Sequence, residues 1–308
     1  MGAGLVVEVL AGGIVGGTSI LYAAVGESYA ESAGVVNLGV EGSMLVGALA
    51  AYAVAAETGS PWAGALAGAA AGGLLALLHA WLVLARRANQ LANGLVVLFL
   101  ALGLTSLFGA AYVSRQSAPF RTWEVPGLSD LPWLGEILFR HDPLTYLSFL
   151  VVPASFWVLH RSGWGLLVRG AGERRNVLAT YGHRVALVQY SAVTLGGVLA
   201  GVGGAQLSTA YGHAWFENMT QGRGFVAAAV VIFAARHPFK VAGGAYLFGA
   251  ALALSPALQA RGYGINQFGL NAIPYVLVIA VLVVLGRRRA AQAPEGLQEV
   301  FEMAPRPA

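Results

Sequence analysis

Residues 91–113 read LANGLVVLFLALGLTSLFGAAYV, an apolar run without a single charged side chain. About 20 such residues in a helix cross the hydrocarbon core of a bilayer. Similar runs recur along the 308 residues of the chain, of which 57% are hydrophobic and only 10% are charged. A soluble domain carries about 25% charged residues, and its core could hide one such run but not eight or nine. The sequence therefore predicts an all-α, polytopic membrane protein.

Nine runs of this kind are expected to cross or enter the membrane. The run at 33–56 holds Asn37 and Glu41, and the run at 224–236 is short, so we expect either one to be a broken or re-entrant helix. The result is a transmembrane helical bundle of about 8–10 spans, with apolar runs at 4–25, 33–56, 61–85, 91–113, 143–160, 186–210, 224–236, 241–258 and 271–286.

The basic residues indicate the orientation of this bundle in the membrane. Most of the 18 Lys and Arg residues follow the odd-numbered runs, and the side of a membrane protein that is richer in these residues is cytoplasmic. The rule predicts a multi-pass protein of the cell (inner) membrane with a cytoplasmic C-terminus. The side of the N-terminus stays open, because one extra re-entrant segment would reverse it. The chain begins with an apolar stretch that lacks basic residues, and we interpret this stretch as a retained first helix and not as a cleaved signal peptide.

We expect one membrane domain over residues 1–289. It carries an external loop at 114–142, in which Trp123 and Trp133 suggest a segment on the membrane interface. It also carries a charged cytoplasmic segment at about 169–184. The remaining residues, 290–308, contain three prolines and are expected to form a disordered cytoplasmic tail.

Composition and motifs predict that the chain is not an enzyme. It has no cysteine, which excludes disulfides and thiolate metal sites. No two histidines stand at metal-ligand spacing, and no Gly-x-Ser-x-Gly or phosphate-binding Gly-rich Lys motif occurs. We therefore predict no metal, no catalytic residue and no nucleotide site. The net charge of +4 is explained by cytoplasmic loops and predicts no binding of nucleic acid.

Many of the 42 glycines recur four positions apart. This spacing lets helix backbones approach closely where lipid provides no hydrophobic drive for association. We expect these glycines to pack helices and not to carry chemistry. Examples are the pairs Gly12 and Gly16, Gly13 and Gly17, Gly68 and Gly72, and Gly197 and Gly201.

The first polar stretch inside an apolar run is VVNLGVEG at 35–42. Asn37 and Glu41 stand four apart, which on a helix puts them on one face. A carboxylate at mid-membrane costs about 2.5–3.5 kcal/mol, so Glu41 must be paired, wetted or protonated. Two interpretations stay open: a cavity-facing element of a transport pathway, or a hydrogen-bond anchor between helices.

The second stretch is FENMTQGRGF at 216–225, which opens the short run at 224–236. Broken helices of this kind line substrate sites in transporters, because their free backbone groups need a wet cavity. The alternative is an external loop with a snorkelling Arg223. On the first interpretation, Arg223 and Glu41 face one wet cavity.

The third stretch is RGAGERRNVLATYG at 169–182. It reads as one short charged helix on the cytoplasmic side, ended by Gly182. Its charge alone is typical of a solvated loop. An ordered, charged helix at this face is also what a transporter needs to receive force from a soluble motor.

Together the three stretches resemble permease subunits of ATP-binding-cassette (ABC) importers of the ribose and branched-chain amino-acid permease superfamily, and most of all the branch for simple sugars and nucleosides. Members carry Glu-Arg-Ala-Gly-Val-Val-Asn-Ile-Gly-x-Glu-Gly-Met-Met, which is similar to residues 31–44 here, with Ser32 and Ser43 as departures. Their pattern Glu-Asn-Met-Thr-x-Gly-Arg-Gly-Phe is matched throughout 217–225.

The charged stretch resembles the family's coupling segment, Gly-Glu-Asn-Pro-x-Ala-Ala-x-x-x-Gly. Arg174 and Arg175 replace its Asn-Pro. The resemblance implies that a separate ATPase contacts this segment, with Gly172, Glu173, Arg174, Arg175 and Gly182 as the coupling residues.

The resemblance also implies a function and a set of partners. The chain would form the translocation pathway for a nucleoside or simple sugar, and ATP and Mg would bind in the partner ATPase, not in this chain. The implied partners are a second permease subunit that is a different, related chain, two cytoplasmic ABC ATPase domains, an extracytoplasmic substrate-binding protein or lipoprotein, and membrane lipid. The implied pathway residues are Asn37, Glu41, Phe216, Asn218, Arg223 and Phe225.

One alternative belongs to a different class of transport protein. In it, the chain is a secondary transporter or channel that is driven by a proton through Glu41.

Overall fold

The computed structural model describes residues 2–262 and, further along, residues 269–270, 272–274, 276–277, 279–280 and 283. The predicted tail at 290–308 and most of the predicted run at 271–286 lie outside these residues.

Helices make up most of the described chain. In chain order the elements are α1 (Gly2–Ser32), α2 (Val40–Thr58), α3 (Pro61–Leu84), α4 (Gln90–Gly109), a 3₁₀ turn (Ala110–Tyr112), β1 (Trp123–Glu124), α5 (Leu134–Leu138), β2 (Arg140–His141), α6 (Pro143–Arg161), α7 (Gly163–Glu173), α8 (Arg175–Thr180), α9 (Val185–Ala205), a π-helix (Gln206–Tyr211), α10 (Arg223–Ala234) and α11 (Pro238–Ala260).

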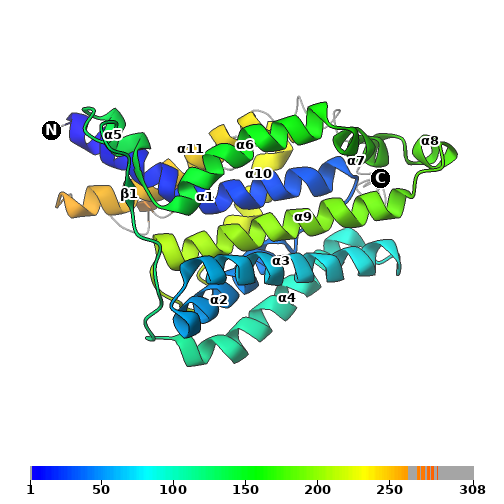
Figure 1. Ribbon diagram of the computed structural model, residues 1–308, viewed down its shortest axis with the longest axis horizontal. Helices are drawn as coiled ribbons and strands as arrows, with labels where there is room; N and C mark the ends of the chain where they lie inside the picture. The colour runs from blue at the N-terminus through cyan, green and yellow to red at the C-terminus, as the bar shows by residue number, and fades with distance from the viewer. Residues whose placement is uncertain are drawn as a thin grey trace.

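The long helices lie side by side along the long axis of the molecule (Figure 1). α1 packs against α9, α10 and α11, α9 also packs against α2 and α3, and α4 lies at the edge. The strand β1 and the short helix α5 lie at one end of the bundle, and α7 and α8 lie at the other. The predicted external loop and the charged segment are thus at opposite ends, as opposite sides of a membrane require.

Seven helices among the described residues are long and apolar enough to cross a membrane: α1, α2, α3, α4, α6, α9 and α11. The 24 residues of α3 extend over about 36 Å, more than the roughly 30 Å of a hydrocarbon core. The predicted helical bundle is confirmed. The 12 residues of α10 reach only about 18 Å, so this helix enters the bundle without crossing it.

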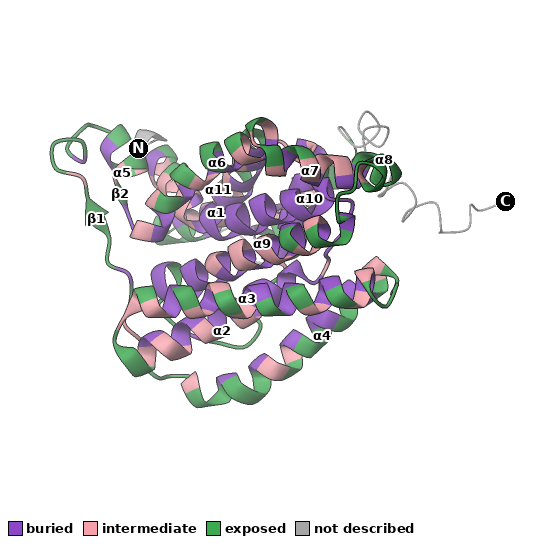
Figure 2. Cartoon of the chain, turned by 45° about the vertical axis from the view of Figure 1, so that its right-hand side comes forward, coloured by how far each residue is buried: buried purple, intermediate pink, exposed green. Residues whose placement is uncertain are grey.

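The outer faces of the bundle are apolar. On α3 and α4 the side chains of Leu66, Leu74, Phe99 and Phe108 are each more than 60% exposed. Figure 2 shows such exposed positions along α4, while the inner helices α1 and α10 are mostly buried. Large exposed apolar surfaces mark contact with lipid or another protein, so these faces suit the interior of a membrane.

The start of the chain differs from the sequence prediction in one respect. The first run was expected to end at residue 25 and a second span to begin at 33. Instead α1 continues to Ser32 with Glu27 and Glu31 buried inside it, and residues 33–39 are not helical. The break follows from Gly34, whose φ of +78° belongs to a region that glycine enters at little cost.

The predicted external loop has a small structure of its own. Trp123 pairs with His141 and Glu124 with Arg140 in a two-stranded antiparallel ladder. The loop ends at Asp142, whose carboxylate accepts the N–H groups of the first turn of α6 at 3.0 Å. Such an N-cap satisfies amides that a helix start otherwise leaves without partners.

The glycine spacing packs helices, as predicted. Gly68 and Gly72 of α3 face Gly197 and Gly201 of α9, and each of these four glycines meets backbone of another helix. A methyl group added to Gly201 would overlap the carbonyl oxygen of Gly68. The two helices therefore lie too close together for any side chain at this crossing.

We expect Gly201→Ala to destabilise the protein, because the added carbon forces α3 and α9 apart. Overpacking of this kind costs about 1–3 kcal/mol. The thermal midpoint in detergent, measured by loss of the monodisperse chromatographic peak, should fall. Gly103→Ala is the matched control, since Gly103 of α4 has open space around it; its midpoint should stay or rise, and an equal loss in both variants would contradict the packing argument.

Candidate functional site

The non-helical residues 33–39 between α1 and α2, here called the connector, lie inside the bundle. Residues 33–37 are all buried. In apolar surroundings a backbone outside regular structure must find its hydrogen-bond partners within the protein. The connector is therefore the part of the chain whose polar groups most need partners.

Side chains from four helices supply those partners. Two side chains donate to carbonyl oxygens of the connector: Gln189 Nε2 of α9 to Ala33 (2.8 Å) and His79 Nε2 of α3 to Val36 (3.1 Å). Two side chains accept backbone N–H groups of the connector: Gln90 Oε1 of α4 from Val36 (2.7 Å) and Glu27 Oε1 of α1 from Asn37 (2.8 Å). Asn93 Nδ2 donates to Nδ1 of His79 at 2.9 Å, which leaves the proton on Nε2 for the connector. The connector is held in one conformation by all four helices.

The expectation that Asn37 and Glu41 share one helical face is wrong. Asn37 belongs to the connector, and α2 begins only at Val40. The helical spacing fails because Asn37 precedes α2 in the non-helical connector, where its N–H donates to Glu27 of α1 and only its carbonyl accepts from Val40, the first residue of α2. The Asn37 side chain is buried, and its Oδ1 has no hydrogen-bond partner among the described residues.

Glu41 holds the start of α10. Its Oε1 accepts the hydroxyl of Thr220 (2.6 Å) and the N–H of Gly222 (2.8 Å), and its Oε2 accepts the N–H of Gly224 (2.5 Å). Free amides and the positive end of the helix dipole both favour a carboxylate at a helix N-terminus. These contacts are those of an anchor between α2 and α10, and a part for Glu41 in the substrate pathway stays a hypothesis.

The segment from 212 to 222 leads irregularly from the π-helix into α10. Asn218 and Gln221 take positive φ values of 55° and 47°, which are uncommon outside glycine. Trp215 and Met219 are buried against α2, whereas Phe216 is 44% exposed. The entry into α10 is thus irregular, as expected of a broken helix, and a wet cavity beside it stays a prediction.

The other predicted pathway residues lie around the same helix start. Phe225 is 39% exposed on α10. Arg223 donates to the carbonyl of Gly16 (3.0 Å) and to Ser19 Oγ (3.1 Å) on α1, and its guanidinium lies 5.2 Å from the centre of the Tyr211 ring. Arg223 and Glu41 thus flank one helix start through different partners, and a cavity shared by them remains a hypothesis.

The charged segment was expected to be one helix, and this is wrong. It comprises the end of α7 and all of α8, which meet at Arg174 with φ −143° and ψ 66°. Gly182 has a φ of +82° just after α8, in keeping with its predicted place at the end of the helix. Glu173 and Arg174 are exposed.

The charged segment contacts the connector directly. A methyl group on Gly172 would overlap the carbonyl oxygen of Ser32, and Gly34 lies on the same side of Gly172. Arg175 donates to Oε1 of Gln189 at 3.0 Å, and the amide of Gln189 bonds the connector. A displacement of α7 or α8 would therefore reach the connector, and beyond it Glu41 and α10.

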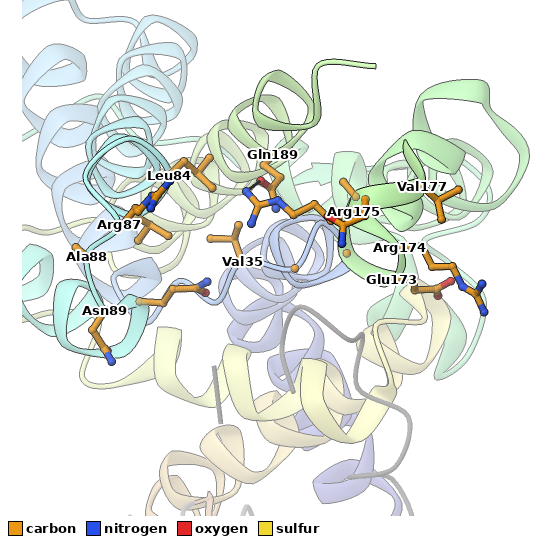
Figure 3. A pocket seen from close by; sticks show the side chains of 16 residues that line it. Val35, Leu84, Arg87, Ala88, Asn89, Glu173, Arg174, Arg175, Val177 and Gln189 are labelled. Atoms are coloured by element: carbon orange, nitrogen blue, oxygen red, sulfur yellow. Dashed lines mark hydrogen bonds between the residues drawn. The ribbon is translucent and has the colours of Figure 1, made fainter. Parts of the chain in front are cut away.

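A cavity of about 1130 Å³ opens beside these contacts (Figure 3). We call it the coupling groove. Its lining comes from the end of α3, the α3–α4 turn, the start of α4, the connector, the charged segment and α9: Gly34, Val35, Val83, Leu84, Arg87, Ala88, Asn89, Gln90, Ala171, Gly172, Glu173, Arg174, Arg175, Asn176, Val177 and Gln189.

Sequence reasoning missed the side chains that hold the connector. No motif of the sequence includes His79, Gln90 or Gln189, and their bonds to the connector join residues that are 43, 54 and 156 positions apart. The sequence also did not bring together His160 and His237, whose ring centres lie 5.7 Å apart. Burial, Lys240 and His160 all lower the pKa of His237.

No group of three or more potential metal ligands occurs among the described residues.

Residues 9–286 match the family described as "Branched-chain amino acid transport system / permease component". The chain belongs to this family, and with its apolar helices it is a multi-pass membrane protein.

Several curated proteins are similar to this chain. "Putative glucose ABC transporter permease protein TsgC13" of Haloferax volcanii is 42% identical over 81% of this chain and 76% of its own length. "Guanosine ABC transporter permease protein NupQ" of Bacillus subtilis is 31% identical over 89% and 91%. "Nucleoside ABC transporter permease protein NupC" of Lactococcus lactis is 29% identical over 92% and 93%. The resemblance to ABC permeases is thereby confirmed.

Glu41→Gln should destabilise the protein, because the amide NH₂ would face the N–H of Gly224 and two donors would oppose each other. Leaving a buried donor unsatisfied costs about 1–3 kcal/mol. The thermal midpoint should fall, and a cysteine placed at Phe225 should react faster with a thiol reagent as α10 loosens. Glu57→Gln is the control, since Glu57 pairs with Arg115 in an exposed ion pair worth at most about 1 kcal/mol. Equal stability of the two variants would rule out the anchor.

Proposed function

We propose that this chain is the membrane-spanning permease subunit of an ATP-driven importer for a simple sugar or nucleoside. The observation that carries the proposal is the contact between the charged segment and the connector. A permease without its own motor needs a place to receive force and a path from there to the substrate. Gly172 and Arg175 would receive the force from the motor, and the connector and Glu41 would transmit it to α10.

The partners follow from this role. ATP and Mg would bind in two cytoplasmic ATPase domains that dock on Gly172, Glu173, Arg174, Arg175 and Gly182, and hydrolysis would take place there. A second, related permease would complete the pathway in the lipid bilayer, and an extracytoplasmic binding protein or lipoprotein would deliver the substrate. The end of the bundle with α7 and α8, and the C-terminus, would face the cytoplasm, in accordance with the basic residues.

The substrate class is supported by two sources. Relatives are named for glucose, guanosine and nucleosides. Phe216 and Phe225 are exposed aromatic rings beside the polar Asn218, and both sugars and nucleobases bind to such combinations of apolar faces and hydrogen-bonding groups. Asn37, Glu41 and Arg223 would also belong to the substrate pathway.

A proton-driven cycle through Glu41 has less support. Three donors point at the Glu41 carboxylate. These contacts tie both carboxylate oxygens of Glu41 to residues 220–224, so the geometry favours a structural anchor between α2 and α10.

In proteoliposomes that contain the permease pair and its ATPase, we expect uptake of labelled glucose or guanosine when ATP is enclosed and the binding protein is outside. Partners would be taken from neighbouring genes. Omitting the ATPase should abolish uptake, because the permease has no energy source. Solute movement by the purified chain alone under a pH gradient would favour the proton-driven alternative.

Reversing two charges in the charged segment, Glu173→Lys with Arg175→Glu, should abolish transport while leaving expression intact. The ATPase would meet the wrong charges, and Arg175 would lose its bond to Gln189. Uptake and ATP hydrolysis are measured on the same complex. The control reverses Glu124 and Arg140, an exposed pair 4.0 Å apart at the opposite end of the bundle. Unimpaired uptake by the first variant would refute the assignment of the coupling residues.

A further inference from the structure

The coupling groove has a wall that does not belong to the charged segment. This wall is the turn between α3 and α4, where Arg87 takes a positive φ of 56° and lines the groove. Figure 3 shows Arg87, Ala88 and Asn89 on one side and Glu173, Arg174 and Arg175 on the other, with Val35 between them. Elements far apart in the sequence thus face each other across one opening.

The groove is basic. Its lining includes Arg87, Arg174 and Arg175 and a single carboxylate, that of Glu173. Arg86, next to Arg87 in the chain, is not part of the lining; its guanidinium lies 5.9 Å from the centre of the Trp81 ring. The lining therefore carries a net positive charge, and opposite charge is what complements such a surface.

The floor of the groove is the connector. Gly34 and Val35 line it, together with Gln189, which bonds the connector. These three residues are buried, so a group that enters the groove would lie over the connector and contact the exposed residues of the two walls. Docking there would place the group next to the connector and on both walls at once.

We propose that the coupling groove receives an acidic element of the ATPase subunit, a loop or helix end with Asp or Glu side chains that pairs with Arg87 and with the arginines opposite. The inference rests on the proposed function and extends it: the α3–α4 turn is a second ATPase contact beside the charged segment. The groove is continuous with that segment, which forms its other wall. An anionic lipid fits less well, because Glu173 would repel its phosphate whereas a protein surface can offer Glu173 an N–H donor.

The test compares Arg87→Glu with Arg86→Glu. Both arginines are exposed on the same turn, so neither change should disturb folding, and both alter the net charge equally. In the purified complex, Arg87→Glu should weaken retention of the ATPase by about tenfold or more and reduce permease-stimulated ATP hydrolysis. Arg86→Glu should stay within about twofold of the unchanged protein. Reversal of one Asp or Glu on the permease-facing surface of the ATPase should restore binding to Arg87→Glu.

The outcomes separate this inference from the function that it rests on. If the unchanged permease neither retains an ATPase nor supports ATP-driven uptake, the proposed function fails. If it does both, and Arg87→Glu behaves like Arg86→Glu, only the groove assignment fails. Loss of bound anionic lipid from Arg87→Glu in native mass spectrometry, with the ATPase fully retained, would also overturn it in favour of a lipid site.

A photo-crosslinking side chain at Val177, which lines the groove and is 46% exposed, identifies the occupant. Capture of an ATPase peptide that contains Asp or Glu is the expected result. Capture of lipid, or of the permease's own residues 290–308, would overturn the proposal. The same probe at Trp157, exposed on α6, is the control and should capture no ATPase.

Discussion

Backbone polar groups that leave a helix inside an apolar bundle must be hydrogen-bonded there, and the connector is where this constraint acts most strongly. Four helices each contribute one side chain to it, so their positions are tied to one short segment. Each of these four hydrogen bonds would be lost if the connector moved away, and the loss is costly for Glu27, His79 and Gln189, which are buried. The arrangement stabilises one conformation of α1, α3, α4 and α9 together, and a movement of the connector must involve all of them.

The same constraint explains how a transporter can be both tightly packed and movable. Helices such as α3 and α9 touch through glycine, with no side chain between them, and this crossing has little freedom. The connector and the 212–222 segment are held by hydrogen bonds to side chains, which can exchange partners more easily than a backbone crossing can change its distance. Transmission from Gly172 to Glu41 would then pass through the hydrogen-bonded parts while the glycine crossings stay fixed.

Buried polar side chains and exposed side chains have separate roles in this protein. Glu27, His79 and Gln189 are buried and bond backbone, so they serve the fold. Phe216 and Phe225 leave aromatic surface exposed, and the arginines of the coupling groove leave charge exposed, at two different places in the bundle. The substrate site and the ATPase site that we propose would therefore be separate from each other.

The sequence by itself determined the class of fold, because apolar runs of bilayer length leave the chain few alternatives. It also determined the family, since the patterns at 31–44 and 217–225 are local and contiguous. Only the tertiary structure decided what Glu41 contacts, that Asn37 lies outside α2, and that Arg87 faces Arg174 and Arg175 across a groove. The physical reason is that these contacts join residues far apart in the chain, and local spacing carries no information about which helices meet. Glu41 accepts hydrogen bonds from the 220–224 segment, a partner that no helical periodicity could have indicated.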